Sequence, residues 1–273
     1  MCDFIYEHLD ENLSVDRLSQ VVHFSRYHFH RQFSEYTGVS VIRFIQLMRL
    51  KRASYQLAFN KQRKIIEIAL DACFENPESF SRAFKNTFGQ TPSQFRMQPK
   101  WELWQETYHF SNNERTQTMD VKVVIFNETK VAALEHRSSP DTVLDSAVKF
   151  IEWRKQSKLS PKDSSDTFGI AYDDPKTTLP ENFRFDICGT VSTDVPVNPQ
   201  GVITKTIPRG RCAVARHLGS HDNIATTVHY LYGEWLPDSG EELRDYPCFF
   251  HYLNLIPDVS EHETITDVYL PLK

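Results

Sequence analysis

The sequence has few of the features that mark a metalloenzyme, a cofactor-dependent enzyme or a disulfide-rich domain. Its five cysteines are scattered and form no Cys-x-x-Cys pair, so neither a disulfide framework nor a zinc site is indicated. The 11 histidines include no His-Glu-x-x-His spacing, and the chain has no phosphate-binding loop, dinucleotide fingerprint or Gly-x-Ser-x-Gly motif. We therefore expect no catalytic residues, no metal ligands and no cofactor.

Long apolar runs are also missing. No stretch approaches the roughly 20 apolar residues that a membrane-spanning helix needs. The first residues lack the basic region followed by an apolar region that defines a secretory signal. The sequence thus predicts a protein of the reducing cytoplasm without a membrane partner.

Charge is distributed unevenly along the 273 residues, which carry a formal net charge of −5. Residues 1–105 hold 14 basic and 11 acidic side chains, whereas the remaining residues hold 17 and 25. Residues 26–52 contain six basic side chains and a single acidic one, Glu35. A basic segment in an acidic protein indicates a polyanionic partner.

The chain divides near residue 110. Residues 4–98 have the pattern of successive helices, and residues 120–270 have that of short strands with two helices. A polar stretch without periodicity lies between them, as is typical of a linker. We predict a multi-domain protein, in which an all-α domain (1–108) and a linker (109–118) precede an α+β domain (119–273).

The first hundred residues predict two helix-turn-helix units. In the first unit, Ser14 caps a short helix, Ser25 caps a second helix, and Gly38 suits the left-handed position that ends it. The second helix has an apolar face of Phe29, Phe33 and Tyr36 and a polar, basic face opposite. The pattern returns at an offset of 51, with Asn76 as the cap and Gly89 as the end. The matched pairs are Phe29/Phe80, Arg31/Arg82, Phe33/Phe84, Gly38/Gly89, Ser40/Thr91 and Phe44/Phe95.

This duplication predicts binding to double-stranded DNA. A long helix over residues 40–59 would hold the two second helices at a fixed separation, so that they enter adjacent major grooves and contact two adjacent half-sites. Arg31 and Arg82 occupy equivalent positions and suit bidentate contacts to guanine. The capped starts at Ser25 and Asn76 suit phosphates, and Arg26 and Lys85 add positive charge.

The two units resemble AraC-type transcriptional regulators. The resemblance rests on Ser25-Arg26-Tyr27-His28-Phe29-His30-Arg31-Gln32-Phe33, Tyr36-Thr37-Gly38, Ile65-Ile66-Glu67-Ile68-Ala69-Leu70-Asp71-Ala72-Cys73-Phe74, Phe80-Ser81-Arg82-Ala83-Phe84-Lys85, Phe88-Gly89, Thr91-Pro92 and Phe95-Arg96. It implies that Tyr27, His30, Arg31, Ser79 and Arg82 contact DNA. The family usually has glycine where this chain has Cys73, so strain is expected in that turn if its φ is positive.

The second half repeats at an offset of 81. Residues 131–136 match residues 212–217, and Asp186-Ile187 matches Asp267-Val268. Each copy predicts a strand–helix–strand–strand unit. The expected strands are 121–126 with 130–136, 167–173 and 183–191, then 202–207 with 211–217, 248–254 and 264–270, and the helices are 141–158 and 222–235. Copies of this kind commonly leave a ligand site at their junction.

This half resembles the GyrI-like effector-binding domain. The resemblance rests on Ala215-Arg216-His217-Leu218-Gly219, Trp235-Leu236-Pro237-Asp238-Ser239-Gly240, Pro247-Cys248-Phe249-Phe250-His251-Tyr252-Leu253-Asn254 and Thr266-Asp267-Val268-Tyr269-Leu270-Pro271. It implies a small organic effector, often an aromatic cation. An AraC-type domain followed by this domain is the layout of right-origin-binding-protein-like regulators.

The aromatic side chains predict the effector site. We expect ligand contacts from Trp153, Tyr172, Phe185, Phe250, Tyr252 and Tyr269. The family often has glutamate two residues before the tyrosine, where a buried carboxylate pairs with a cation. This chain has Phe250 there, which favours an aromatic or apolar effector unless Glu152 or Asp267 replaces the missing acid.

The sequence therefore predicts a DNA-binding transcription regulator that responds to a small-molecule effector and has RNA polymerase as a further partner. Two alternatives stay open. In one, the second half is a hydrolase or a drug-sequestering domain localised by the DNA-binding half; Phe250 disfavours the hydrolase, because related hydrolases rely on that glutamate. In the other, the second half binds only protein.

Overall fold

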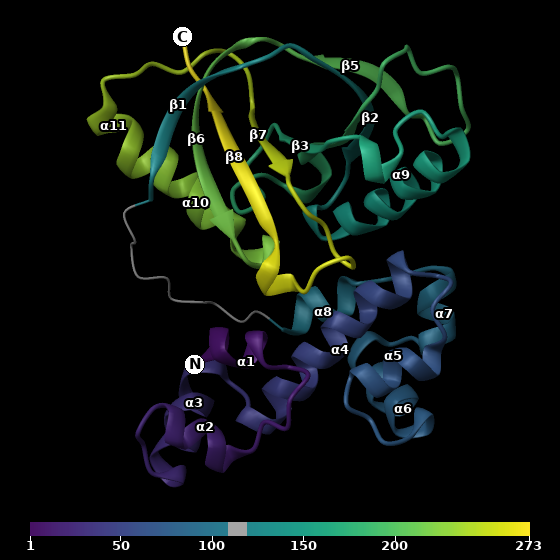
Figure 1. Cartoon of the computed structure of the whole chain (residues 1–273), viewed down its shortest axis with the longest axis vertical. Helices are drawn as coiled ribbons and strands as arrows, with labels where there is room; N and C mark the ends of the chain where they lie inside the picture. Colours follow the sequence, from purple (N-terminus) through teal and green to yellow (C-terminus); the bar gives the residue numbers. More distant parts are fainter. Residues whose placement is uncertain (109–118) are drawn as a thin grey trace. The chain divides into compact units, whose positions relative to one another are not determined.

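The computed structural model describes residues 1–108 and 119–273, and only the backbone of Tyr27, Gln105 and Glu106. The predicted linker, residues 109–118, lies outside the described residues. The chain forms two compact units, one containing α1–α8 and the other containing the eight strands with their helices (Figure 1). No helix in the described ranges is both long enough and apolar enough to cross a membrane.

Within residues 1–108 the N-terminal unit has eight α-helices, and side-chain caps set most of their boundaries. Ser14, Ser25, Ser40, Asn76 and Thr91 each accept a hydrogen bond from the backbone N–H three residues later. The predicted caps at Ser14, Ser25 and Asn76 are thus confirmed. The helices are α1 (Cys2–Glu7), α2 (Val15–Val21), α3 (Arg26–Thr37), α4 (Val41–Phe59), α5 (Ile65–Asp71), α6 (Pro77–Phe88), α7 (Pro92–Met97) and α8 (Glu102–Thr107).

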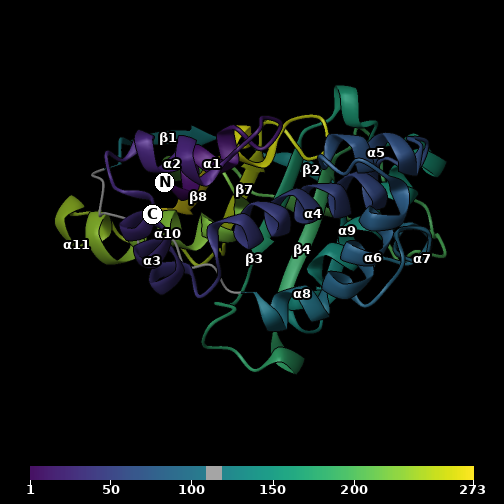
Figure 2. The same ribbon diagram turned by 90° about the horizontal axis from the view of Figure 1, so that it is seen from below.

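Helix α4 joins the two helix-turn-helix units, as the sequence predicted (Figure 2). It contacts α3 in the first unit and α5, α6 and α7 in the second. The predicted inward stripes are buried at Phe29, Phe33, Phe80, Phe84 and Phe88. Tyr36 is an exception, because it is 52% exposed although its spacing placed it on the apolar face. The equivalent position in the second unit is the buried Thr87.

The turns before α3 and α6 share one hydrogen-bonded geometry. Phe24 N–H donates to the Ser19 carbonyl, and Phe74 N–H donates to the Ala69 carbonyl. Both turns pass through a left-handed residue that is not glycine, His23 at φ 55° and Cys73 at φ 58°. The strain expected at Cys73 is therefore present, and His23 carries the same strain in the first unit.

Replacing Cys73 with glycine should stabilise the N-terminal unit by about 1 kcal/mol, because glycine lacks the Cβ that disfavours positive φ. The Cys73 side chain is exposed, so its removal costs little packing. Urea denaturation would measure the gain. Cys73→Ala keeps the Cβ and should show no comparable gain; equal stabilisation by both variants would contradict this explanation.

The C-terminal unit contains the eight strands found in residues 119–273 and the helices that accompany them. A π-helical segment, Leu231–Trp235, joins α10 to α11. The elements are β1 (Val121–Phe126), β2 (Thr129–Arg137), α9 (Val143–Ser157), β3 (Thr167–Ala171), β4 (Arg184–Thr190), β5 (Ile203–Ile207), β6 (Gly210–Leu218), α10 (Ile224–Tyr230), α11 (Leu236–Ser239), β7 (Cys248–Tyr252) and β8 (Ile265–Pro271).

The two copies exchange their first strands. The sheet order is β1-β6-β8-β7-β3-β4-β2-β5, so β1 pairs with β6 of the second copy, and β5 pairs with β2 of the first. The antiparallel register continues through both pairings, from Val121 opposite Ala215 to Ala133 opposite Ile203. Strands β1–β2 and β5–β6 thus act as two long bent arms that arch over one end of the sheet (Figure 1). This exchange was not predicted from the sequence.

Alternation along the strands gives the sheet two faces. We call the face that packs against α9 and α10 the helix face; its core includes Leu134, Phe185, Phe250 and Val268. The opposite face has a core that includes Val131, Phe168, Cys188 and Phe249. Both helices lie on one side because the duplication repeats the position of the helix as well as that of the strands.

Buried histidines fasten each helix to its strand in the same way. His136 Nδ1 lies 2.9 Å from Ser146 Oγ, and His217 Nδ1 lies 2.9 Å from Thr227 Oγ1. His136 and His217 are 81 residues apart, and so are Ser146 and Thr227. The predicted repeat therefore extends to the hydrogen bonds between strand and helix.

Candidate nucleic-acid interface and effector site

The exposed faces of α3 and α6 carry the residues that the sequence assigned to DNA. Ser25, Arg26, His30 and Arg31 are exposed at or on α3. Asn76, Arg82 and Lys85 are exposed at or on α6, whereas Ser79 is half-buried. Tyr27 belongs to α3 by its backbone, and its side chain is outside the described part of the chain. Each helix thus turns its phenylalanines inward and its basic residues outward.

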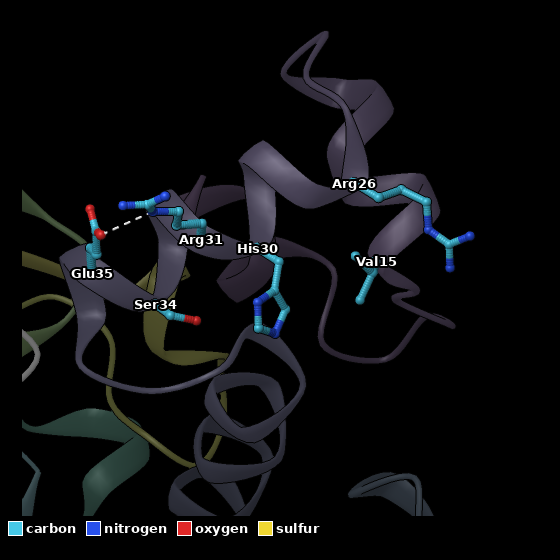
Figure 3. Close-up of a pocket in the computed structure, with 6 residues that line it drawn as sticks. All are labelled: Val15, Arg26, His30, Arg31, Ser34 and Glu35. Carbon is cyan, nitrogen blue, oxygen red and sulfur yellow. Dashed lines mark hydrogen bonds and ion pairs between the residues drawn. The ribbon is translucent and has the colours of Figure 1, made fainter.

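The basic residues of α3 are paired with acids. Arg31 Nε lies 3.3 Å from Glu35 Oε1, one turn further along the same helix. Arg26 Nε lies 2.6 Å from Asp16 Oδ1 on α2. These side chains border a hollow lined by Val15, Arg26, His30, Arg31, Ser34 and Glu35 (Figure 3). Basic groups and acids therefore share the front of the first unit.

The front of α6 differs in charge. Among the described residues, no carboxylate lies within 4 Å of the Arg82 guanidinium or the Lys85 ammonium, although Glu78 is one turn before Arg82. The two helices have the same length and the same kind of cap, but among the described side chains both arginines of α3 are paired with an acid, whereas Arg82 and Lys85 of α6 are not.

The expected effector residues do not form one group. Phe185, Phe250 and Tyr252 lie together on the helix face, and the rings of Phe185 and Phe250 are 6.2 Å apart. Trp153 on α9 is buried in the same core, where it stacks on Phe150. Tyr172 and Tyr269 belong to the opposite face of the sheet, because alternate residues of a strand point to opposite sides. The structure thus separates these two tyrosines from the other four residues.

Gly169 on β3 lets the aromatic rings of the helix face lie against the sheet. A Cβ at this position would lie 2.5 Å from Phe185 Cζ and 2.7 Å from the Tyr252 hydroxyl oxygen. We call Phe185, Phe250, Tyr252 and Gly169 the aromatic floor. Burial raises the pKa of Tyr252, which keeps its hydroxyl neutral. Gly169 was not among the residues that the sequence predicted for the effector site.

The floor contains no acid that could replace the missing glutamate. Phe250 is 6% exposed and occupies the position of that acid. Asp267 lies on the opposite face, where Arg216 donates to it with both Nε and Nη2, at 2.7 and 2.9 Å. Glu152, on α9, is half-buried. Within the described ranges, no group of three or more His, Cys, Asp or Glu side chains is placed to hold a metal ion.

An ionic cluster built around the buried Asp186 occupies the opposite face. Asp186 is fully buried, and its Oδ2 accepts hydrogen bonds from Lys205 Nζ at 2.6 Å and from the Tyr172 hydroxyl at 2.8 Å. Lys205 also donates to Glu135, and Arg137 lies within ion-pair distance of both acids. Sequence reasoning missed this cluster, although an aspartate within the apolar run Phe185-Asp186-Ile187-Cys188 was a signal of a buried polar group.

The cluster shifts the pKa values of its members. Burial and the hydrogen bond to Asp186 raise the pKa of Tyr172 to about 12. Burial alone would lower the pKa of Lys205, but its hydrogen bonds to Asp186 and Glu135 outweigh that effect and raise it. Lys205 therefore stays charged and Tyr172 stays protonated at neutral pH.

Both halves of the chain match known families. Residues 18–98 match a helix-turn-helix domain, and residues 119–273, more than half of the chain, match the GyrI-like small molecule binding domain. "Probable transcriptional regulator YgiV" of Escherichia coli strain K12 is 51% identical over 155 residues, which cover 57% of this chain and 97% of the relative. "Right origin-binding protein" of the same strain is 36% identical over 97 residues, which cover 36% of this chain and 33% of that protein.

A solved structure also resembles the second half. The crystal structure of the EcmrR C-terminal domain aligns with a TM-score of 0.47 and 20% identity, over 57% of this chain and 99% of that chain. By the two family matches, the chain belongs to the GyrI-like family and carries an AraC-type helix-turn-helix domain before its GyrI-like domain, which together make it a DNA-binding transcriptional regulator.

Proposed function

We propose that α3 and α6 enter adjacent major grooves of one DNA duplex, with Arg31 and Arg82 contacting bases. The observation that carries this proposal is the duplication of a capped, exposed helix with arginine at the same position in each copy. Ser25, Arg26, Tyr27, His30, Asn76, Ser79 and Lys85 then contact the phosphates or base edges around these arginines.

Arg82→Ala should weaken binding to the preferred DNA by about 1–3 kcal/mol and relax its specificity at one base pair, because the bidentate contact to guanine is lost. The preferred sequence would first be selected from a random duplex pool with the full chain, and affinities would then be measured by fluorescence anisotropy.

Lys100→Ala is the matched control, since Lys100 is exposed in the same unit but lies outside α3 and α6, the two proposed recognition helices. It should leave specificity unchanged and reduce affinity only slightly. Equal effects of Lys100→Ala and Arg82→Ala would contradict base contact by Arg82.

We propose further that the aromatic floor binds a flat, uncharged organic effector. Its aromatic side chains suit stacking on a flat ligand, and the Tyr252 hydroxyl offers one polar group to orient the ligand. A cation would need a buried counter-charge, whereas the position before His251-Tyr252 holds the apolar Phe250. The absence of a carboxylate there also supports a binding role without catalysis.

Thermal denaturation with a matched pair of compounds tests the effector. 2-Naphthol should raise the melting temperature of the full chain, and a naphthyl trimethylammonium ion of the same ring size should not. A shift with the ammonium compound alone would contradict an uncharged effector, and no shift with either would favour a second domain that binds only protein. Contact with RNA polymerase stays a prediction.

A further inference from the structure

The two recognition helices differ at one position beside their shared arginine. Arg31 is followed four residues later by Glu35, whereas Arg82 is followed four residues later by Asn86. Residues four apart on a helix are neighbours on its surface, so each side chain is placed to contact its arginine. The repeat thus retains the arginine and changes the residue four positions after it from an acid to a neutral amide, while Glu78, four positions before Arg82, lies beyond ion-pair distance of it.

The contacts follow this difference. Arg31 Nε lies 3.3 Å from Glu35 Oε1, on the same side of α3 (Figure 3). The Arg31 side chain is 64% exposed and that of Glu35 is 68% exposed. Arg82 has no carboxylate within 4 Å among the described residues. The ion pair between Arg31 and Glu35 therefore has to break before Arg31 can contact a base, whereas Arg82 has no such pair to break.

We infer that Glu35 competes with DNA for Arg31 and thereby makes the first unit the weaker of the two DNA contacts. This inference rests on the proposed function of α3 and α6. An exposed ion pair is weak, so the competition is modest, and it acts on the first half-site alone.

Neutralising Glu35 is the direct test. Glu35→Gln should tighten binding to the selected duplex by about two- to fivefold, the range set by an exposed ion pair. In an Arg31→Ala background the same substitution should give almost no gain, because the group that Glu35 holds is gone. This double-mutant cycle separates competition for Arg31 from general repulsion of phosphates.

The second unit supplies the reciprocal test. Asn86→Glu places the same acid four residues after Arg82 and should weaken binding by a similar factor. Asn86→Gln has nearly the same size without the charge and should leave affinity unchanged. All variants would be compared by fluorescence anisotropy on one duplex, with circular dichroism to verify their folding.

The outcomes distinguish this inference from the function on which it rests. If Arg82→Ala weakens binding but Glu35→Gln gives no gain, the competition is wrong and the DNA-binding role stands. A gain that persists in Arg31→Ala, or a changed base preference in Glu35→Gln, also overturns the inference, since the latter would mean that Glu35 contacts cytosine. If random selection yields no preferred duplex, the proposed function fails as well.

Discussion

Replacing Lys205 with methionine should destabilise the C-terminal unit by about 3 kcal/mol. The substitution leaves the fully buried Asp186 without its closest cation, and an uncompensated buried charge typically costs about 3–5 kcal/mol. We expect the lower end of this range, because Arg137 and the Tyr172 hydroxyl still contact the carboxylate. Equilibrium urea denaturation, followed by tryptophan fluorescence, would measure the loss.

A second lysine in the same sheet provides the control. Lys130 pairs with Asp194 at 2.9 Å, but their side chains are 43% and 80% exposed. Lys130→Met should therefore cost less than about 1 kcal/mol. Lys205→Arg retains the charge and should recover most of the stability. A cost for Lys205→Met no larger than that for Lys130→Met would show that Asp186 does not depend on Lys205.

The prediction also tests how the two copies of the C-terminal repeat are held together. Lys205 belongs to β5 of the second copy, and the acids that it bridges, Glu135 and Asp186, belong to β2 and β4 of the first. Because β5 lies beside β2 only through the exchange, the ionic cluster holds one exchanged arm in place. Lys205→Met with Asp186→Leu should be more stable than Lys205→Met alone, since apolar residues can replace a buried ion pair at little cost.

Local features of the fold could be predicted because they depend on neighbouring residues. Ser25, Asn76 and Gly38 define helix ends through hydrogen bonds and a backbone angle that involve only a few residues. The same holds for the inward phenylalanines, whose spacing fixes the buried face. Tyr36 shows the limit: periodicity gives its direction, but the elements that pack nearby decide whether it is covered.

Strand partners could not be predicted in the same way. Only two residues, Asn127 and Glu128, separate β1 from β2, and such a short connection normally indicates a hairpin. Here the chain continues across the arch, so that each arm pairs with the other copy. Alternation of apolar residues fixes which face a side chain occupies but not which strand lies beside it. Tyr172 and Tyr269 were grouped with Phe250 because alternation relates faces within one strand only, whereas the register between strands decides which residues of different strands share a face.

Phe250→Glu should convert the aromatic floor from a neutral site to a cation site, at a large cost in stability. Phe250 is 6% exposed, so the new carboxyl would be buried and its pKa raised, and the loss at pH 7 should reach about 3–5 kcal/mol. Phe250→Gln removes the same ring without adding charge. The difference in unfolding free energy between the two variants therefore isolates the charge.

The sign of the pH dependence follows from the raised pKa. Below the pKa of about 4.3 for an unfolded glutamate, the carboxyl is protonated in both states, and the two variants should be equally stable. As the pH rises, the unfolded chain ionises first, so Phe250→Glu loses stability relative to Phe250→Gln until the folded carboxyl also ionises. A difference that is independent of pH would mean that the side chain at position 250 reaches solvent.

A cationic ligand should reverse this loss. The naphthyl trimethylammonium ion pairs with the new carboxylate and stacks on Phe185 and Tyr252, and at a hundredfold excess over its Kd a ligand stabilises by about 2.7 kcal/mol. We expect it to raise the melting temperature of Phe250→Glu but neither that of the wild type nor that of Phe250→Gln. If the ammonium ion leaves Phe250→Glu unchanged while 2-naphthol still stabilises the wild type, the effector binds away from the aromatic floor.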